Sequence, residues 1–150
     1  MKIAILNRQR RRKIPTKMLR AAAVKILSDL GCTSSELSVS IVGDRAMRVL
    51  NREYLQKDHP TNVISFSMQE GEYGSLVPGL LGDVVISADT ATKEADDAGI
   101  TLQERLVFLL LHGILHLTGY DHERSGEAEA RRMEAQEANI FAALQLQGLT

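Results

Sequence analysis

Residues 101–122, TLQERLVFLLLHGILHLTGYDH, predict the central element of this protein. Thr101 and Glu104 have the Ser/Thr-x-x-Glu spacing of a capping box, which predicts a helix that begins at Leu102. Leucines then recur on most sides of that helix, which is typical of a helix buried at the centre of a domain. The pattern therefore places His112 and His116 on the last turns of a rigid, buried helix, which can fix the geometry of a site.

Three of the four histidines lie in this stretch, at positions 112, 116 and 122. His112 and His116 are four residues apart, so a helix puts them on one face, one turn above the other. Gly119 lets the chain leave the helix, and the short step to His122 can bring its ring back toward the same point. Three converging imidazoles without a cysteine or a further histidine nearby predict a catalytic zinc centre with one open coordination position.

The spacing of these histidines equals that of the metzincin proteases, H-E-x-x-H-x-x-G-x-x-H. Where those enzymes have the glutamate that serves as general base, this chain has Gly113. Because glycine has no side chain that takes a proton, position 113 argues against peptide hydrolysis, while the histidine spacing still predicts a metal site. A metalloprotease-like amide hydrolase stays open as an alternative function.

The flanking sequence predicts further strands and amphipathic helices. Short apolar runs predict strands at residues 3–6, 39–42, 63–67 and 84–87. Helical spacing predicts helices over 16–30 (with Gly31 after it), from Asp44 as the capping residue, from 89 or 90 to Gly99, and over 125–146. These elements predict a single α+β domain over residues 1–150, in which a small mixed sheet of about four strands packs with about five helices. Between the last two strands, a Gly- and Pro-containing stretch of about fifteen residues predicts a functional or mobile loop.

The composition, 44% hydrophobic and 25% charged residues, is typical of a soluble globular protein. The longest strongly apolar run, residues 106–111, is too short to cross a membrane, and no apolar segment follows the basic N-terminal residues as it would in a secretory signal. The single cysteine, Cys32, cannot form an internal disulfide, which suits a reducing compartment. We therefore expect a cytoplasmic protein that does not bind membranes.

The net charge of −1 conceals an uneven distribution. Residues 1–60 carry a charge of +8 and residues 61–150 a charge of −9. The basic half contains a dense run of four arginines, and three more lie on one side of a predicted helix: Arg8, Arg10, Arg11 and Arg12, then Arg45, Arg48 and Arg52. Such basic surfaces attract phosphate backbones, so we expect the first run to bind a phosphate-rich partner; a solvated charged surface is the alternative.

Three segments of this chain resemble the YbeY-type endoribonucleases, which are bacterial rRNA maturation factors: HGILHLTGYDH at 112–122, KDHPTNVISF at 57–66 and LGDVVIS at 81–87. The segments occur in the order of that family, and the resemblance covers nearly the whole chain. It implies a zinc-dependent ribonuclease that acts on single-stranded RNA. It also implies maturation of the 3′ end of small-subunit ribosomal RNA, ribosome quality control, and contact with the small subunit or its proteins.

One position departs from the family pattern. The family often has an arginine, with an assigned catalytic role, directly after the aromatic residue that corresponds to Tyr54, and this chain has Leu55 there. Either a neighbouring cation supplies the positive charge at the phosphate, or the arginine is dispensable. The candidate neighbours are Lys57, Arg48 and Arg52.

Two aspartates are candidates for supporting the metal ligands. Asp83 lies in a predicted strand, where it either accepts a hydrogen bond from a ligating histidine or caps the turn after Gly82. Asp121 lies between two of the histidines and either supports a ligand or only shapes the turn. His59 precedes Pro60, so we expect it in an extended surface loop.

These observations together predict a metal-dependent endoribonuclease. One Zn²⁺ per chain is expected on His112, His116 and His122, with the metal-bound water as the catalytic group. Three imidazoles also suit nickel or another divalent metal. A second alternative is a non-catalytic ribosome-binding factor that contains zinc. The oligomeric state stays open.

Overall fold

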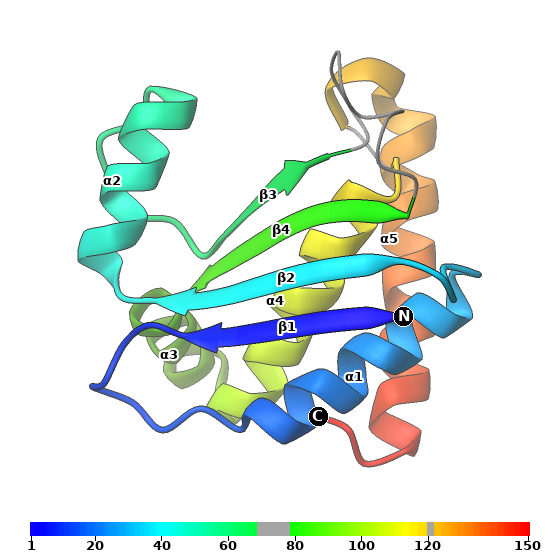
Figure 1. Cartoon of the computed structure of the whole chain (residues 1–150), viewed down its shortest axis with the longest axis horizontal. Coiled ribbons are helices and arrows are strands. Elements are labelled where there is room, and N and C mark those ends of the chain that lie inside the picture. The colour runs from blue at the N-terminus through cyan, green and yellow to red at the C-terminus, as the bar shows by residue number, and fades with distance from the viewer. Residues whose placement is uncertain (69–78, 120–121) are drawn as a thin grey trace.

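The centre of the molecule is one mixed sheet of four strands in the order β1-β2-β4-β3, as the computed structural model in Figure 1 shows. The strands are β1 (Lys2–Asn7), β2 (Glu36–Val42), β3 (Val63–Ser67) and β4 (Leu80–Ser87). β1, β2 and β4 run parallel, and β3 pairs antiparallel with β4 at one edge. The structure describes residues 1–68, 79–119 and 122–150, and leaves out the side chains of 122–125.

Five helices accompany the sheet within these residues: α1 (Thr16–Asp29), α2 (Asp44–Leu55), α3 (Ala88–Ala98), α4 (Leu102–Leu117) and α5 (His122–Leu146). α1, α4 and α5 pack together on one face of the sheet, and α2 belongs to the other face (Figure 1). This arrangement confirms the predicted α+β class, with a mixed sheet and a central helix that carries two of the histidines. Among the described residues, no single helix is long and apolar enough to cross a membrane, although α3 and α4 meet that test as a pair bent by 116°.

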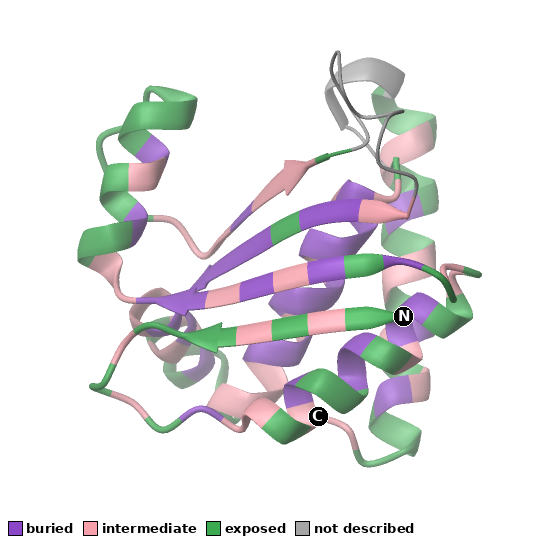
Figure 2. Ribbon diagram, in the orientation of Figure 1, coloured by how far each residue is buried: buried purple, intermediate pink, exposed green. Residues whose placement is uncertain are grey.

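Buried residues alternate with less buried ones along β2 (Figure 2), and the sheet separates two hydrophobic cores of unequal size. Leu37, Val39 and Ile41 of β2 face α1 and α4 and join the large hydrophobic core. Ser38 and Ser40 point the other way, as the period of two in a strand requires. On that second face, a small cluster lies under α2: Val42, Met47, Ile64 and Val85, with Leu50 and Phe66 against it.

The start and the burial of α4 agree with the sequence. The Thr101 hydroxyl accepts a hydrogen bond from the Glu104 backbone N–H at 3.1 Å, and the helix begins at Leu102. Nine of its residues are buried, including Leu106, Leu109 and Leu110. α4 packs against the sheet on one side and against α1, α3 and α5 on others. Its apolar residues are therefore distributed over most sides of the helix and not confined to one stripe.

Asp44 is not the cap that the sequence predicted. The capping position of α2 belongs to Gly43, and Asp44 is the first helical residue. Its carboxylate instead accepts hydrogen bonds from the hydroxyls of Ser87 and Thr90, both at 2.6 Å. Ser87 in turn caps α3, so that helix begins at Ala88, just before the predicted 89 or 90. One hydroxyl at the end of β4 and one in the first turn of α3 thus compete with the local backbone for the Asp44 carboxylate.

Several further predicted boundaries differ from those in the structure. β2 and β4 begin earlier than the predicted residues 39 and 84, because parallel pairing with their neighbours extends them to Glu36 and Leu80. α5 begins at His122, three residues before the predicted start, but it is interrupted at Gly126, where φ is +69°, so its continuous part follows close to the predicted start. The predicted Gly- and Pro-containing loop falls mostly on residues 69–78, which lie outside the described residues.

Candidate metal centre

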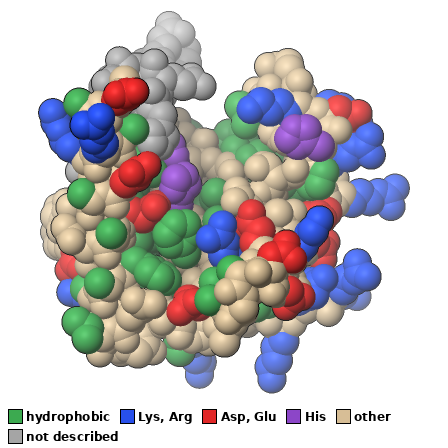
Figure 3. Space-filling model, turned by 180° about the vertical axis from the view of Figure 1, so that it is seen from behind, with side chains coloured by type: hydrophobic (Ala, Val, Ile, Leu, Met, Phe, Trp, Pro, Cys, Tyr) green, Lys and Arg blue, Asp and Glu red, His purple; other side chains and the backbone are tan. Residues whose placement is uncertain are grey.

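His112 and His116 face each other on the last turns of α4. Their Nε2 atoms are 3.1 Å apart, and their ring centroids are 4.7 Å apart with the rings at 70°. Both side chains are half-buried. On the face drawn in Figure 3, one patch of histidine side chains lies in a hollow and a second lies on a raised part of the surface.

The distance between these two nitrogens fits a shared metal ion. Two imidazole nitrogens bound to one tetrahedral zinc at about 2.0–2.1 Å are separated by roughly 3.3–3.4 Å. The observed 3.1 Å is close to that separation, and both nitrogens point into the same space. His112 and His116 thus have the geometry of two ligands on adjacent turns of one helix.

The third predicted ligand cannot be placed in the same way. Gly119 has a φ of +101°, a backbone conformation that glycine adopts readily, and it turns the chain away from α4 as predicted. His122 is the first residue of α5, but its side chain lies outside the described residues, as does all of Asp121. Among the residues that the structure describes, no group of three His, Cys, Asp or Glu side chains is assembled for a metal. His122 and Asp121 therefore stay predictions.

Gly113 lies at a close approach between α4 and the sheet. A Cβ atom at this position would come within 2.7 Å of Val84 Cγ1, and 3.2 Å of Ser65 Oγ. The Ser65 hydroxyl donates a hydrogen bond to the Gly113 carbonyl at 2.9 Å. A glutamate at position 113 has no room here, so this fold lacks the general base of the metzincin proteases for a packing reason.

Glu137 is a residue of this site that the sequence analysis missed. Its Oε2 lies 2.7 Å from His112 Nδ1, although the two residues are 25 positions apart and lie on different helices. The Glu137 side chain is only 13% exposed. A signal was present in the sequence: Glu137 lies four residues after Met133 and three before Ile140, which are both buried on the inner face of α5.

Asp83 does not take the supporting role that was considered for it at His112 or His116. It lies on β4 between the buried Gly82 and Val84 and points to the face under α2, whereas α4 packs on the opposite face. There it lines a groove of about 420 Å³ together with Arg8, Ser38 and others. The alternation of side chains along the strand therefore separates Asp83 from the histidine pair.

The three cations considered in place of the family arginine lie on or just after α2. Arg48 donates two hydrogen bonds to the Asp58 carboxylate, at 2.8 and 3.1 Å, and Arg52 lies 3.9 Å from the same group. The hydrogen bond from Arg48 holds the pKa of Asp58 below its ordinary value. Lys57 is exposed and, in the described part of the chain, has no ion pair. Of the three, Lys57 is the one without an ion pair among the described residues.

The basic run lies at the far end of the sheet from the histidines. It follows the carboxyl end of β1, where the Arg8 N–H donates to the Ile41 carbonyl at the end of β2. The histidine end of α4 lies instead near the start of β4, where a Cβ on Gly82 would be 3.1 Å from the Leu117 side chain. Arg8, Arg10 and Arg11 are exposed, while Arg12 is half-buried.

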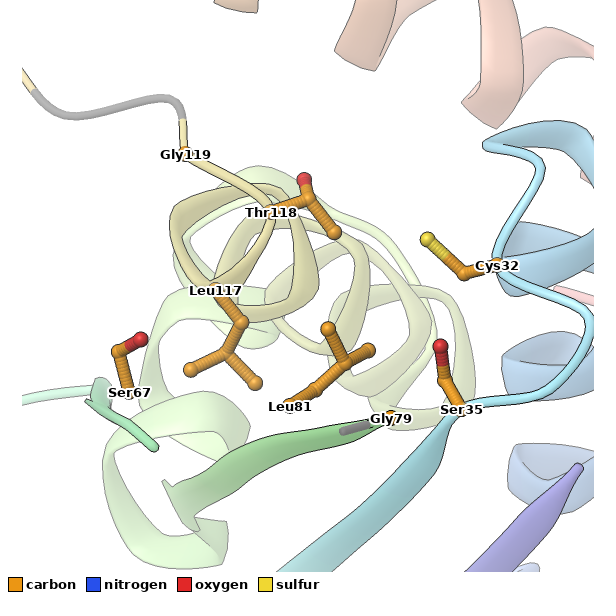
Figure 4. A pocket seen from close by; sticks show the side chains of 8 residues that line it. All are labelled: Cys32, Ser35, Ser67, Gly79, Leu81, Leu117, Thr118 and Gly119. Carbon is orange, nitrogen blue, oxygen red and sulfur yellow. The ribbon is translucent and has the colours of Figure 1, made fainter. Parts of the chain in front are cut away.

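A pocket adjoins the histidine-bearing end of α4 (Figure 4). Its volume is about 470 Å³, and it lies between the end of α4, the starts of β2 and β4, and the residues after α1. Leu81 and Leu117 give it apolar walls, and Ser35, Ser67 and Thr118 add hydroxyl groups. Thr118 is the second residue after His116, so the pocket lies at the same end of α4 as the histidine pair, although side chains two residues apart on a helix do not face each other.

The fold and the histidine pair define a small α+β protein with a candidate metal centre at the end of its central helix. The family model described as Endoribonuclease YbeY matches residues 4–145. A protein of Geobacter metallireducens named Endoribonuclease YbeY is 66% identical to this chain over 149 residues, covering 99% of each. The protein of that name from Geobacter sulfurreducens is 64% identical with the same coverage. This chain belongs to the Endoribonuclease YbeY family, which confirms the resemblance found in its sequence.

A solved structure agrees with the fold. The solution structure of a Thermotoga maritima protein aligns with a TM-score of 0.62 over 98% of this chain and 94% of that one. At 19% sequence identity, this likeness supports the arrangement of strands and helices only.

Proposed function

We propose that this protein is a metal-dependent endoribonuclease that hydrolyses single-stranded RNA at a zinc ion held by His112, His116 and His122. Membership of the Endoribonuclease YbeY family supports the endoribonuclease activity. The separation of 3.1 Å between the Nε2 atoms of His112 and His116 is the observation that carries the metal site. One ion per chain is proposed, and nickel or another divalent metal also suits imidazole ligands.

When bound, zinc supplies an activated water molecule and polarises a phosphate oxygen of the substrate. The chain's own contribution is to hold its ligands on a rigid helix, because α4 is buried along most of its length. No side chain at position 113 takes a proton, and packing against Val84 keeps that position small. Position 113, which supplies the general base in the metzincins, therefore supplies no acid–base group in this protein.

The exposed cations of the N-terminal half are proposed to hold the RNA backbone. Arg8, Arg10 and Arg11 lie on the loop after β1, and Lys57 follows α2 without an ion pair among the described residues. Lys57 is proposed to supply the charge that the family arginine supplies elsewhere, because Asp58 already pairs with Arg48 and Arg52. Phosphate contacts of this kind add affinity without sequence preference.

The proposed cellular role follows from the family resemblance. It is maturation of the 3′ end of small-subunit ribosomal RNA and ribosome quality control, in the cytoplasm, with the small subunit or its proteins as partners. The uneven charge, +8 over residues 1–60, is compatible with a partner that is rich in phosphate.

The test compares metal-loaded and chelated protein on two substrates, ribosomal RNA fragments and casein. We expect cleavage of single-stranded RNA by the zinc-loaded protein alone, and no cleavage of casein. His116→Ala should lose both the metal and the activity, whereas His59→Ala, which changes the exposed histidine of the loop after α2, should keep both. Cleavage of casein would favour the amide hydrolase, and bound zinc without any cleavage would favour a non-catalytic ribosome-binding factor.

A further inference from the structure

The contact between His112 and Glu137 joins two helices at the candidate metal centre. His112 Nδ1 and Glu137 Oε2 are 2.7 Å apart, a short distance for a nitrogen and an oxygen. The glutamate side chain is 13% exposed and the histidine side chain 33% exposed, so water competes only weakly for the carboxylate. A half-buried histidine that already has one fixed partner has little freedom to turn.

This contact determines which ring nitrogen of His112 carries the proton. An ionised carboxylate only accepts hydrogen bonds, so Nδ1 must donate. In the neutral ring, Nε2 then keeps its lone pair. That lone pair faces His116 Nε2 at 3.1 Å, which is the space proposed for the metal.

Neighbouring aromatic rings fix the register between the two helices. Phe108, one turn before His112 on α4, stacks on the His112 ring with the planes at 21°. Phe141, one turn after Glu137 on α5, meets Phe108 edge-on at a centroid distance of 5.5 Å. Phe108 and His112 are four residues apart on α4, and Glu137 and Phe141 are four residues apart on α5. Because the two helices run antiparallel, the Phe108–Phe141 contact brings Glu137 level with His112.

We infer that Glu137 is a positioning residue for the metal site, which orients the His112 ring and holds it in the tautomer that presents Nε2 to the metal. This inference rests on the proposed metal centre. Carboxylates that accept from the second nitrogen of a ligating histidine strengthen that ligand, and their loss typically weakens metal affinity about 10–100-fold.

The test measures the dissociation constant for zinc by competition with a chromophoric chelator, using the full chain. Glu137→Gln keeps the size of the side chain but removes its charge and adds an N–H donor, so we expect affinity to fall about 10–100-fold. Glu137→Asp should recover part of the loss because it restores a carboxylate. Glu134→Gln, an exposed glutamate three residues earlier on α5, is the matched control and should bind as the unchanged protein does.

Two further measurements separate positioning from simple packing. In the cobalt-loaded protein, Glu137→Gln should change the visible absorption bands, which report the ligand geometry, and Glu134→Gln should not. In the unchanged, metal-free protein, nitrogen NMR of the imidazole rings should find His112 protonated at Nδ1. This last measurement applies even if the variants at 137 fail to fold.

Three results would overturn the inference. One is a neutral His112 ring that carries its proton at Nε2. Another is that Glu137→Gln and the unchanged protein have equal zinc affinity and equal cobalt spectra, even if the variant melts at a lower temperature. Absence of zinc binding by the unchanged protein would overturn the proposed metal centre together with the inference. If the unchanged protein binds zinc and Glu137→Gln binds it equally well, only the inference about Glu137 would be overturned.

Discussion

Asp89 connects three parts of the chain at the carboxyl end of the sheet. Its Oδ2 accepts a hydrogen bond from the Asp44 backbone N–H at 2.9 Å, and its Oδ1 accepts one from Arg12 Nε at 3.2 Å. The bond from the Asp44 N–H, and then the one from Arg12, lower the pKa of Asp89 from its ordinary value of 3.8. The ionised carboxylate thus ties the basic loop and the start of α2 to α3.

Asp89→Asn should lower the free energy of unfolding in a pH-dependent manner. Because the folded-state pKa is below the unfolded one, the contribution of Asp89 is fully present above about pH 5 and is lost as pH falls through the folded-state pKa. Urea unfolding at several pH values should therefore show a difference between variant and unchanged protein that is largest near neutral pH and shrinks in acid. Asp97→Asn, an exposed change on the same helix, is the control, and a difference that does not vary with pH would contradict the prediction.

Residues of the site differ in how far the sequence alone could predict them. The facing of His112 and His116 follows from a spacing of four on one helix, which is a local property. The position of Glu137 depends on the register between α4 and α5, which the packing of Phe108 against Phe141 sets. Asp83 was considered as a partner because it lies in a family segment, but the face to which it points depends on strand pairing.

Gly113 of α4 lies close against the sheet. Gly113→Ala would gain about 0.5–1 kcal/mol from helix propensity. The added methyl would meet Val84 at 2.7 Å, however, and overpacking of a core costs about 1–3 kcal/mol. We expect a net loss of stability by urea unfolding, with His112 and His116 displaced away from the sheet and lower zinc affinity.

Removal of the opposing methyl groups should relieve the clash. Val84→Ala alone leaves a cavity and destabilises the protein. In Gly113→Ala/Val84→Ala, the new methyl occupies part of that space, so the double variant should lose less stability than the two single losses added together. If the losses of stability are additive, a clash between the new methyl group and Val84 is not the reason why Gly113→Ala destabilises the protein.

The basic loop after β1 should divide into arginines that bind RNA and one that stabilises the fold. Arg10→Ser/Arg11→Ser should weaken binding of single-stranded RNA and reduce the dependence of log affinity on log salt by about 0.7 per lost contact. Its melting temperature should stay the same, because both side chains are exposed. Arg12→Ser should lower the melting temperature, since it breaks the pair with Asp89. An unchanged salt dependence in the double variant would mean that the loop is only solvated.

The boundaries of helices and strands, like the residues of the site, could be predicted where nearby residues set them and were missed where distant residues set them. The start of α4 at Leu102 and the end of α3 before Gly99 were predicted, because a capping hydroxyl and a glycine at φ +69° act within a few residues. The early starts of β2 and β4 were missed, because only pairing between distant segments reveals them. Asp44 was assigned wrongly as a cap for a similar reason, since its hydroxyl partners come from residues 87 and 90.

At the scale of the whole molecule, the two faces of the sheet contribute unequally to stability. The histidine-bearing α4 is part of the large core shared with α1, α5 and the inner face of the strands. α2 contributes Met47 to a cluster of four buried residues, completed by Val42, Ile64 and Val85 of the sheet, and most of its own side chains are exposed. Elements with few buried apolar contacts open at lower free energy than the core does.

The small cluster under α2 therefore makes the protein a candidate for stepwise opening, visible by exchange of backbone amide hydrogens with deuterium. Amides of α2 should exchange through a local opening, while those in the middle of α4 should exchange only with global unfolding. Met47→Ala should speed exchange throughout α2 and leave α4 nearly as slow as before, whereas equal acceleration of both helices would contradict this. Arg48 and Arg52 would then move with a part of the chain that detaches and returns while the histidine pair keeps its spacing.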